Sequence, residues 1–548
     1  MSGPAAPDLI AGAGPARRYA PVSGIEWIGL LLALGAVLAP FCFVTYPPLH
    51  DYPFHLARIQ ILHSLGSGEY FDRIYSFNSW LLPNVAMDFV LYGLVRHGGD
   101  VQLAGLLLVA AVQVFTVGGV AFLRWTLQRR FGLAPLLAAI VAHNWIFLFG
   151  FVNYLIGLAL FLWCFALWIH QMDAALVPRL MVGAFAAAML FFCHFLAFSV
   201  FALAVFAFEL QHAIANRQNG VSAVVRLAVS GLPLLAPLMI FVLLTPTSGE
   251  AGPDPLGDWY RSLEFSRKPL HLVHSLLSGN IWVDFATIGL ACGLAIGAGW
   301  LLAKRGARFQ LDRRLCLPLT ALCLLPLLAP PRLFSAFFID YRLLLPFVYV
   351  AIAAARLELP PQRWRTLAGI GVAIVVAGRA AAFSAIWSTY EGIGDQYMAA
   401  FRALPRPATL YVAFGEKSPV LRKHLGLWSD RWNPPLKHVV SLASLAGDIY
   451  VPATWAHPSQ QPIVVRERYR ASYQLQGANP IAISRADDLL LLVKRIRIAH
   501  HAGAHPPGSV LILLLYPGAV ENIASFPGAP IASGQGFIVL NLPMDGAN

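Results

Sequence analysis

The residues best suited to chemistry lie in the segment 46–58, which contains one acid, two histidines and one arginine. Asp51 precedes residues 54–65, whose partly amphipathic pattern predicts a helix at the membrane surface. Within about two helical turns His55 and Arg58 would share the side of Asp51. A carboxylate there could act as general base toward the hydroxyl group of an acceptor. Asp is also a preferred residue at helix N-termini, and Pro53 suits a first helical turn. Spacing alone leaves open whether Asp51 is catalytic or only caps the helix.

Charged residues also occur at two places late in the apolar part of the chain. Asp340 and Arg342 lie at the outer end of a predicted span, and an arginine presents a fork of donors suited to phosphate. Arg379 falls within the last span, where a charge costs about 2.5–3.5 kcal/mol and usually faces a cavity or a partner. The alternatives are a surface ion pair between Asp340 and Arg342, and an Arg379 side chain that extends toward the interface.

Asn153 and His194 are polar residues at predicted turns on the outer face, where they could line a cavity for an acceptor. Capping of helix ends and burial of a satisfied histidine are the alternative explanations. No Cys/His spacing typical of zinc sites occurs in the sequence. The sequence therefore requires no cofactor, although it leaves room for a divalent metal ion.

These residues must be positioned by a chain of 548 residues that is 58% hydrophobic and only 12% charged. The mean hydropathy of +0.65 excludes a disordered chain and disfavours a purely cytosolic enzyme. A polytopic membrane protein is therefore expected. The net charge of +12 comes from small basic groups between apolar stretches. That distribution is typical of membrane topology, so no nucleic-acid partner is expected.

The apolar stretches predict about eleven transmembrane helices. The segment 83–95 is too short for a span and contains Asp88, so we interpret it as a helix that lies at the outer interface. The predicted spans are 24–45, 101–123, 132–149, 151–169, 176–193, 194–210, 224–244, 283–302, 315–329, 341–355 and 367–387.

The basic residues indicate how this helical domain is oriented. With the N-terminus in the cytoplasm, the predicted cytoplasmic segments carry about twice as many Lys and Arg residues as the outer loops. An odd number of spans places the C-terminus outside. From residue 389 the composition changes, and short β-like runs appear at 409–414, 438–442, 489–493, 510–515 and 537–540. We therefore predict an all-α membrane domain at 1–388 and a small extracytoplasmic α/β domain at 389–548.

The sequence resembles the GT-C glycosyltransferases, which include protein O-mannosyltransferases and lipid A aminoarabinose transferases. The likeness rests on a long first helix that ends in Tyr46-Pro47-Pro48, on the acid Asp51 that opens a large outer loop with surface helices, and on the basic turn Arg129-Arg130 after the next span. An outer α/β domain at the C-terminus also fits. The resemblance implies that Asp51 is the catalytic base and that Arg342, with Arg379, holds the phosphate of a lipid donor. The other residues that we predict to bind substrate are His55, Arg58, Asn153, His194 and Asp340.

We expect from this resemblance an inverting membrane glycosyltransferase of the bacterial inner membrane, surrounded by membrane lipids. It would move a sugar from a polyprenyl-phosphate donor to a lipid, glycan or protein acceptor on the periplasmic side. One alternative is a transporter or flippase for a lipid-linked substrate, although only Arg379 is a deeply placed charge. Another is a non-catalytic subunit of an envelope assembly.

Overall fold

The structure, a computed structural model of the chain, is mostly helical. It describes residues 22–245, 266–278, 280–304, 308–333, 336–358, 362–415, 437–477, 480–526, 528–542 and 544. Within these residues, seven helices are long and apolar enough to cross a membrane. They are α1 (Gly24–Leu38, continued by the 3-10 helix η1, Ala39–Phe43), α5 (Val101–Gln128), α8 (Val152–His170), α9 (Leu176–Cys193), α10 (Phe195–Ala215), α11 (Gly220–Leu244) and α17 (Gln362–Ala403).

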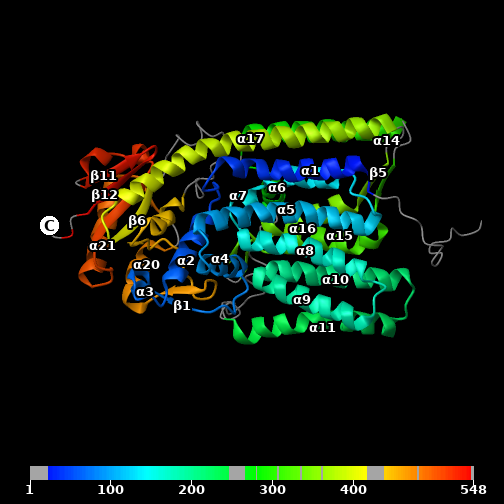
Figure 1. Cartoon of the computed structure of the whole chain (residues 1–548), viewed down its shortest axis with the longest axis horizontal. Coiled ribbons are helices and arrows are strands. Elements are labelled where there is room, and N and C mark those ends of the chain that lie inside the picture. The colour runs from blue at the N-terminus through cyan, green and yellow to red at the C-terminus, as the bar shows by residue number, and fades with distance from the viewer. Residues whose placement is uncertain are drawn as a thin grey trace, which may run out of the picture.

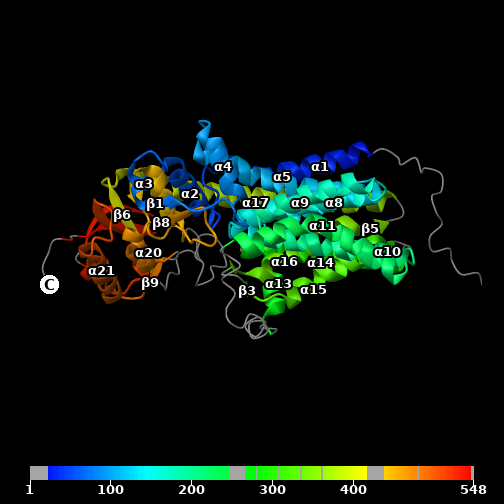
Figure 2. The ribbon, with the colours of Figure 1, turned by 90° about the horizontal axis from the view of Figure 1, so that it is seen from below.

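These helices run side by side in a long bundle, and the main β-sheet lies beyond one end of that bundle (Figures 1 and 2). Three further helices occupy predicted spans, namely α14 (Ile281–Lys304), α15 (Cys316–Leu328) and α16 (Ile339–Ala354). The predicted span 132–149 is not one helix. It divides into α6 (Ala134–Ala142) and α7 (Trp145–Leu148), because the Asn144 side chain accepts a hydrogen bond from the Phe147 N–H and starts a new helix.

A buried ion cluster joins α9, α10 and α11 at one end of the bundle. Glu209 of α10 is fully buried and accepts hydrogen bonds from Arg179 and from Arg226, the latter with an Nε–Oε2 distance of 2.5 Å. It also accepts a hydrogen bond from the Trp168 indole. The sequence predicted that this span ends at residue 210, which would place Glu209 at the helix end. Helix α10 instead continues to Ala215, and Glu209 lies inside the bundle. The two arginines neutralise its charge, so Glu209 holds α9 and α11 against α10.

Short helices of the first long loop cover the end of the bundle nearest the sheet (Figures 1 and 2). They are α2 (Tyr52–Ser64), α3 (Tyr70–Ile74) and α4 (Ala86–Arg96). With 11 residues α4 is too short to span a membrane, as predicted. We predicted a membrane-surface helix at residues 54–65, but almost every residue of α2 is buried within the protein. The C-terminal elements η4 (Val439–Leu442) and α19 (Ala443–Ala446) pack against it.

The C-terminal part contains a six-stranded sheet in the order β11-β12-β10-β6-β7, with β9 also paired to β6. Its central strands β6 (Ala408–Gly415) and β10 (Ser509–Leu515) are parallel, and β12 (Phe537–Asn541) is antiparallel to β10. The remaining strands are β7 (Ile449–Tyr450), β9 (Ile481–Ile483) and β11 (Ala529–Gly534). Separately, β1 (Tyr75–Phe77) of the first loop pairs with β8 (Ile463–Val465), so the first loop and the C-terminal part are joined by main-chain hydrogen bonds.

Three of the five predicted strand segments are strands in the structure, at 409–414, 510–515 and 537–540. The prediction at 438–442 is wrong, because this segment is the 3-10 helix η4. The prediction at 489–493 is also wrong, because it lies in α21 (Ala486–His501). There Leu489, Leu492, Val493 and Ile496 are buried at helical spacing. Short apolar runs do not distinguish strands from buried helices.

The helix α17 connects the two parts of the molecule without a break (Figure 1). Its 42 residues correspond to a length of about 63 Å at 1.5 Å per residue. This is roughly twice the hydrocarbon thickness of a bilayer. The helix therefore continues past residue 388, where the sequence predicted the end of the membrane domain, and contacts β11.

Candidate active site between the first loop and the C-terminal part

Main-chain contacts fix Asp51 at the start of α2. The His50 and Asp51 N–H groups donate to the carbonyl oxygens of Leu148 and Phe149, at 2.9 and 3.0 Å. Next to them, Gly150 has φ = +83°, and a Cβ atom there would lie 2.9 Å from the Asp51 nitrogen. This position therefore requires glycine, both for its backbone conformation and for space.

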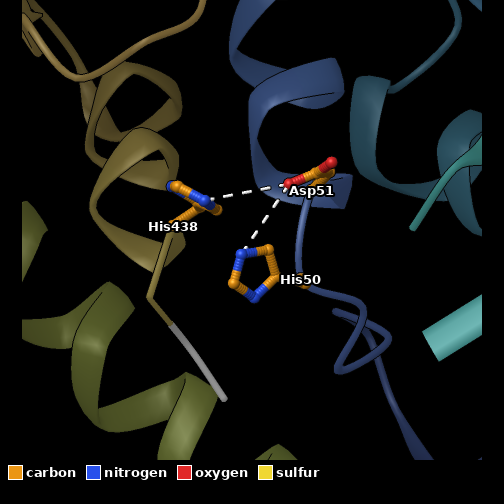
Figure 3. A group of neighbouring side chains, drawn as sticks. All are labelled: His50, Asp51 and His438. Carbon is orange, nitrogen blue, oxygen red and sulfur yellow. Dashed lines mark ion pairs between the residues drawn. The ribbon is translucent and has the colours of Figure 1, made fainter. Parts of the chain in front are cut away.

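The Asp51 side chain does not cap α2, although Asp51 holds the N-cap position. Its Oδ1 atom instead lies 3.9 Å from Nε2 of His50 and 3.8 Å from Nε2 of His438 (Figure 3). Both distances exceed hydrogen-bond length. No described residue donates a hydrogen bond to this carboxylate, which is a quarter exposed. The capping alternative is thus not realised, and the carboxylate is available to a ligand.

Burial and charge act in opposite directions on Asp51. Burial raises its pKa to about 7, while the positive charges of Arg342, Lys437 and Arg58 pull the pKa down. The same burial lowers the pKa of His50 to about 3 and lowers that of His438 as well. Near neutral pH both imidazoles are therefore uncharged, and Asp51 can either hold or release a proton.

Arg342 presents a guanidinium group with unused donors beside this cluster. Its Cζ atom lies 3.6 Å from the ring centroid of Phe151, and its Nε is buried without a hydrogen-bond partner. Its Nη1 lies 3.2 Å from Nε2 of His194. Nδ1 of His194 already accepts the Leu196 N–H, so in the neutral ring the proton belongs on Nε2. Nε2 then cannot accept from the arginine, which keeps donors for another group.

Partly exposed aromatic rings connect the surroundings of Asp51 with those of Arg342. Phe149 stacks on Phe151 and packs at a tilt against His50, with centroid separations of 4.5 Å in both cases. Phe338 lies 5.3 Å from Phe149 and completes the group. Such a surface suits the apolar faces of a ligand held between a carboxylate and a guanidinium.

Asp340 does not belong to this group, contrary to the predicted substrate-binding role and to the alternative of a surface pair with Arg342. It is fully buried, and its Oδ2 lies 2.9 Å from both Lys268 Nζ and His271 Nδ1. Both partners belong to α13 (Lys268–Leu276). Asp340 therefore fastens α13 to the start of α16.

His55, Arg58 and Asn153 also serve contacts inside the protein. Arg58 is 1% exposed and forms a two-point ion pair with Asp88, at 2.5 and 3.1 Å. Its Nη2 also lies 2.7 Å from Nδ1 of His55. Asn153 accepts from the Met87 N–H and donates to a carbonyl oxygen just before α4. We predicted these three residues as substrate ligands, but their polar groups hold α2, α4 and α8 together.

Arg379 lies elsewhere in the bundle. Its Nη1 donates to Oγ1 of Thr287 in α14 at 2.6 Å, and its Nη2 lies 3.5 Å from the His143 carbonyl oxygen. It is 8% exposed, so it does not extend into solvent. Arg379 is not among the charges that act on Asp51. The structure thus brings Arg342 and His194 to the Asp51 region, but not Arg379.

Sequence reasoning missed the contribution of the C-terminal part. His438 lies immediately before η4, and the packing of η4 on α2 carries it to Asp51 (Figure 3). No local spacing links residue 438 to residue 51. His50, one of the two histidines in the first loop, was not assigned a role. His50, Asp51 and His438 are the described residues whose ligand atoms, all within 4.8 Å of one another, could hold a metal ion.

No protein-family model matches the chain, and no curated protein matches it in sequence. Among solved structures it is similar to ArnT from Cupriavidus metallidurans in the apo state, with 11% identity and a TM-score of 0.51. That alignment covers 96% of this chain and 99% of ArnT. For ArnT bound to undecaprenyl phosphate the identity is 11%, the TM-score is 0.49, and the alignment covers 96% and 100% of the two chains.

At 11% sequence identity, the similarity to apo ArnT, with its TM-score of 0.51, shows a shared fold. ArnT is a GT-C lipid A aminoarabinose transferase. With seven apolar helices and this likeness over nearly its whole length, the chain is a membrane protein with the GT-C fold, as its sequence predicted.

Proposed function

We propose that the protein is a membrane glycosyltransferase that moves a sugar from a polyprenyl-phosphate donor to a hydroxyl group of an acceptor. The observation that carries this proposal is the pairing of Asp51 and Arg342. Asp51 offers a partly exposed carboxylate that accepts no hydrogen bond from a described residue. The positive charge of Arg342 acts on it more strongly than any other charge, and Arg342 retains unused donors. A base and an anion-binding group thus occupy one region.

The reaction assigns one role to each group. The acceptor oxygen attacks the anomeric carbon from the side opposite the phosphate, so the configuration inverts. Asp51 takes the hydroxyl proton as the new C–O bond forms. The bond between the anomeric carbon and the phosphate oxygen breaks, and its electron pair leaves with the lipid phosphate. Arg342 stabilises the charge that develops on that phosphate. The rings of Phe149, Phe151 and Phe338 would contact the apolar faces of the sugar.

The shared fold supports the donor class. ArnT has been crystallised with undecaprenyl phosphate bound, and the apo form of ArnT is the structure whose fold this chain shares. We propose undecaprenyl phosphate or a related polyprenyl phosphate as the carrier. The acceptor would be a lipid, glycan or protein that reaches the outer face of the bacterial inner membrane. The N-terminus would then be cytoplasmic, and the sheet-containing C-terminal part would be periplasmic.

The test compares Asp51→Asn with wild type in proteoliposomes that contain undecaprenyl-phosphate-linked sugars and an envelope extract. The assay measures the release of undecaprenyl phosphate. We expect a loss of at least about 100-fold, the lower range for removal of a general base. Asp72→Asn, which changes a partly exposed acid of α3 in the same loop, is the matched control and should keep wild-type activity. Full activity of Asp51→Asn would reject the assignment.

A further inference from the structure

The three polar side chains in Figure 3 converge within ion-pair distance but form no hydrogen bond with one another. The Nε2 atoms of His50 and His438 lie 3.9 and 3.8 Å from the same Asp51 oxygen, Oδ1. The two imidazole rings meet edge to face, with centroids 4.5 Å apart. Hydrogen bonds would bring these atoms to about 2.7–3.2 Å. Two ligands bound to one tetrahedral ion at about 2.0–2.1 Å would be roughly 3.4 Å apart, which is close to the observed separations.

Both histidines are buried but have no hydrogen-bond partner for their side chains among the described residues. The side chain of His50 is 8% exposed and that of His438 is 4% exposed. Burial of a polar ring without a partner is costly. Because each ring directs Nε2 toward Asp51, a ligand between the three side chains would satisfy all of them at once. The His438 ring also packs on Phe54, with centroids 4.1 Å apart, but its Nδ1 is buried without a hydrogen-bond partner, so no other polar contact holds this ring.

We infer that His50, Asp51 and His438 bind a divalent transition-metal ion of the zinc type. Two imidazoles and one carboxylate are the donor set of open catalytic zinc sites, which leave a coordination position for an oxygen ligand. Nitrogen donors disfavour Mg²⁺ and Ca²⁺, which prefer oxygen ligands.

The arrangement leaves the second oxygen of Asp51 for chemistry. Both histidines approach Oδ1, so the ion would bind that atom and leave Oδ2 to accept a proton. In a role that rests on the proposed function, the acceptor hydroxyl would occupy the open coordination position. The ion would then lower the pKa of that hydroxyl. A site of this kind also makes the first loop depend on the C-terminal part, because each supplies a ligand.

The test measures metal in the full-length protein purified in detergent without chelator. Inductively coupled plasma mass spectrometry should find about one zinc-type ion per chain in wild type. His50→Ala and His438→Ala should each hold less than about a fifth of that amount. His63→Ala and His457→Ala are matched controls, one on α2 and one in the C-terminal part, and should retain the ion. Equal metal content in all five proteins, or none in wild type, would overturn the inference.

A second measurement separates loss of the ion from misfolding. After EDTA treatment, Co²⁺ should restore the melting temperature of wild type and produce visible absorption bands, whereas Mg²⁺ should do neither. His438→Gln, which keeps a polar side chain, should fold but show neither response. Absence of Co²⁺ bands in folded wild type would overturn the inference. Neither readout uses glycosyl transfer. A metal-loaded protein in which Asp51→Asn stays active would therefore reject the proposed function alone, and a metal-free protein that needs Asp51 would reject the metal site alone.

Discussion

Nε2 of His438 lies 3.8 Å from Oδ1 of Asp51, so the first loop and the C-terminal part of the chain both contribute side chains to the candidate active site. The contact is supported on both sides. The packing of η4 on α2 positions His438, and the pairing of β1 with β8 joins the same two regions. At the start of the loop, shortly before Asp51, Glu391 of α17 accepts hydrogen bonds from the N–H and hydroxyl of Thr45. The site therefore depends on the folding of both parts.

Arg342 should matter for the departure of the phosphate. Arg342→Gln removes the positive charge, and we expect kcat to fall by about 100-fold or more, the scale for losing one group that stabilises a developing anion. Arg342→Lys keeps the charge but loses the two-point geometry, so its activity should be intermediate. The measurement is steady-state release of polyprenyl phosphate. Arg332→Gln, which changes an exposed arginine near the same end of α16, is the control. Wild-type kcat in Arg342→Gln would contradict this role.

Gly150 should be required for the position of Asp51. Gly150→Ala places a Cβ atom 2.9 Å from the Asp51 nitrogen, in a backbone conformation that costs about 1–2 kcal/mol for other residues. The melting temperature and the transfer rate should both fall. Gly93→Ala in α4 is the matched control, because nothing lies within 4 Å of its Cβ position and alanine favours helix. Unchanged transfer by Gly150→Ala would show that the turn does not position the carboxylate.

The Arg58–Asp88 pair should be structural. Asp88→Asn leaves a buried guanidinium without its counter-charge, which costs about 3–5 kcal/mol in such pairs. We expect poor expression or a marked fall in melting temperature. The double variant Arg58→Met, Asp88→Leu removes both charges and should be more stable than Asp88→Asn. If Asp88→Asn were as stable as wild type but inactive, Arg58 would instead belong to the substrate site.

Acid should destabilise the metal-free protein through the two buried histidines. In the unfolded chain each takes up a proton below about pH 6.5, whereas in the folded protein His50 stays neutral until about pH 3. Asp51 acts in the opposite sense, since the folded state holds its proton up to about pH 7. Burial also lowers the pKa of His438 in the folded protein. Below about pH 6.5 the unfolded state therefore gains protons at both histidines, against one at Asp51 in the folded state, so stability should fall as the pH falls.

The comparison that isolates this effect uses melting temperatures in EDTA at several pH values. His50→Gln removes one of the two histidine protons, so its acid-side slope should be shallower than that of wild type. His63→Gln changes an exposed histidine of α2 and should keep the wild-type slope. Identical slopes for His50→Gln and wild type would mean that the His50 pKa is not lowered in the folded protein.

The sequence predicted most of the bundle because long apolar stretches report directly on burial in lipid or protein. Asp51 could be singled out for a similar reason, since an acid between a long apolar stretch and a helix start has few roles. The fate of the neighbouring polar groups could not be read in this way. Arg58 and Asp340 were assigned to substrate, but Asp88 and Lys268 pair with them after folding, and those partners come from other elements.

His438 illustrates the limit most clearly. The segment that follows it is apolar and was predicted as a strand, but it forms η4 because it packs against the buried helix α2. That tertiary contact, and not any local pattern, carries the imidazole to Asp51. Likewise, α2 was predicted at the membrane surface because nothing in its own sequence indicates that the C-terminal part covers it.

The most direct test of the central claim, that Asp51 and Arg342 serve one site, is a cryo-electron microscopy structure of the protein with undecaprenyl phosphate. We predict that a phosphate oxygen lies within hydrogen-bond distance of the Arg342 guanidinium, about 2.7–3.2 Å. The phosphate should face the Asp51 carboxylate across the space where a sugar would fit. A phosphate bound at Arg379 instead, or one separated from Asp51 by packed side chains, would contradict the claim.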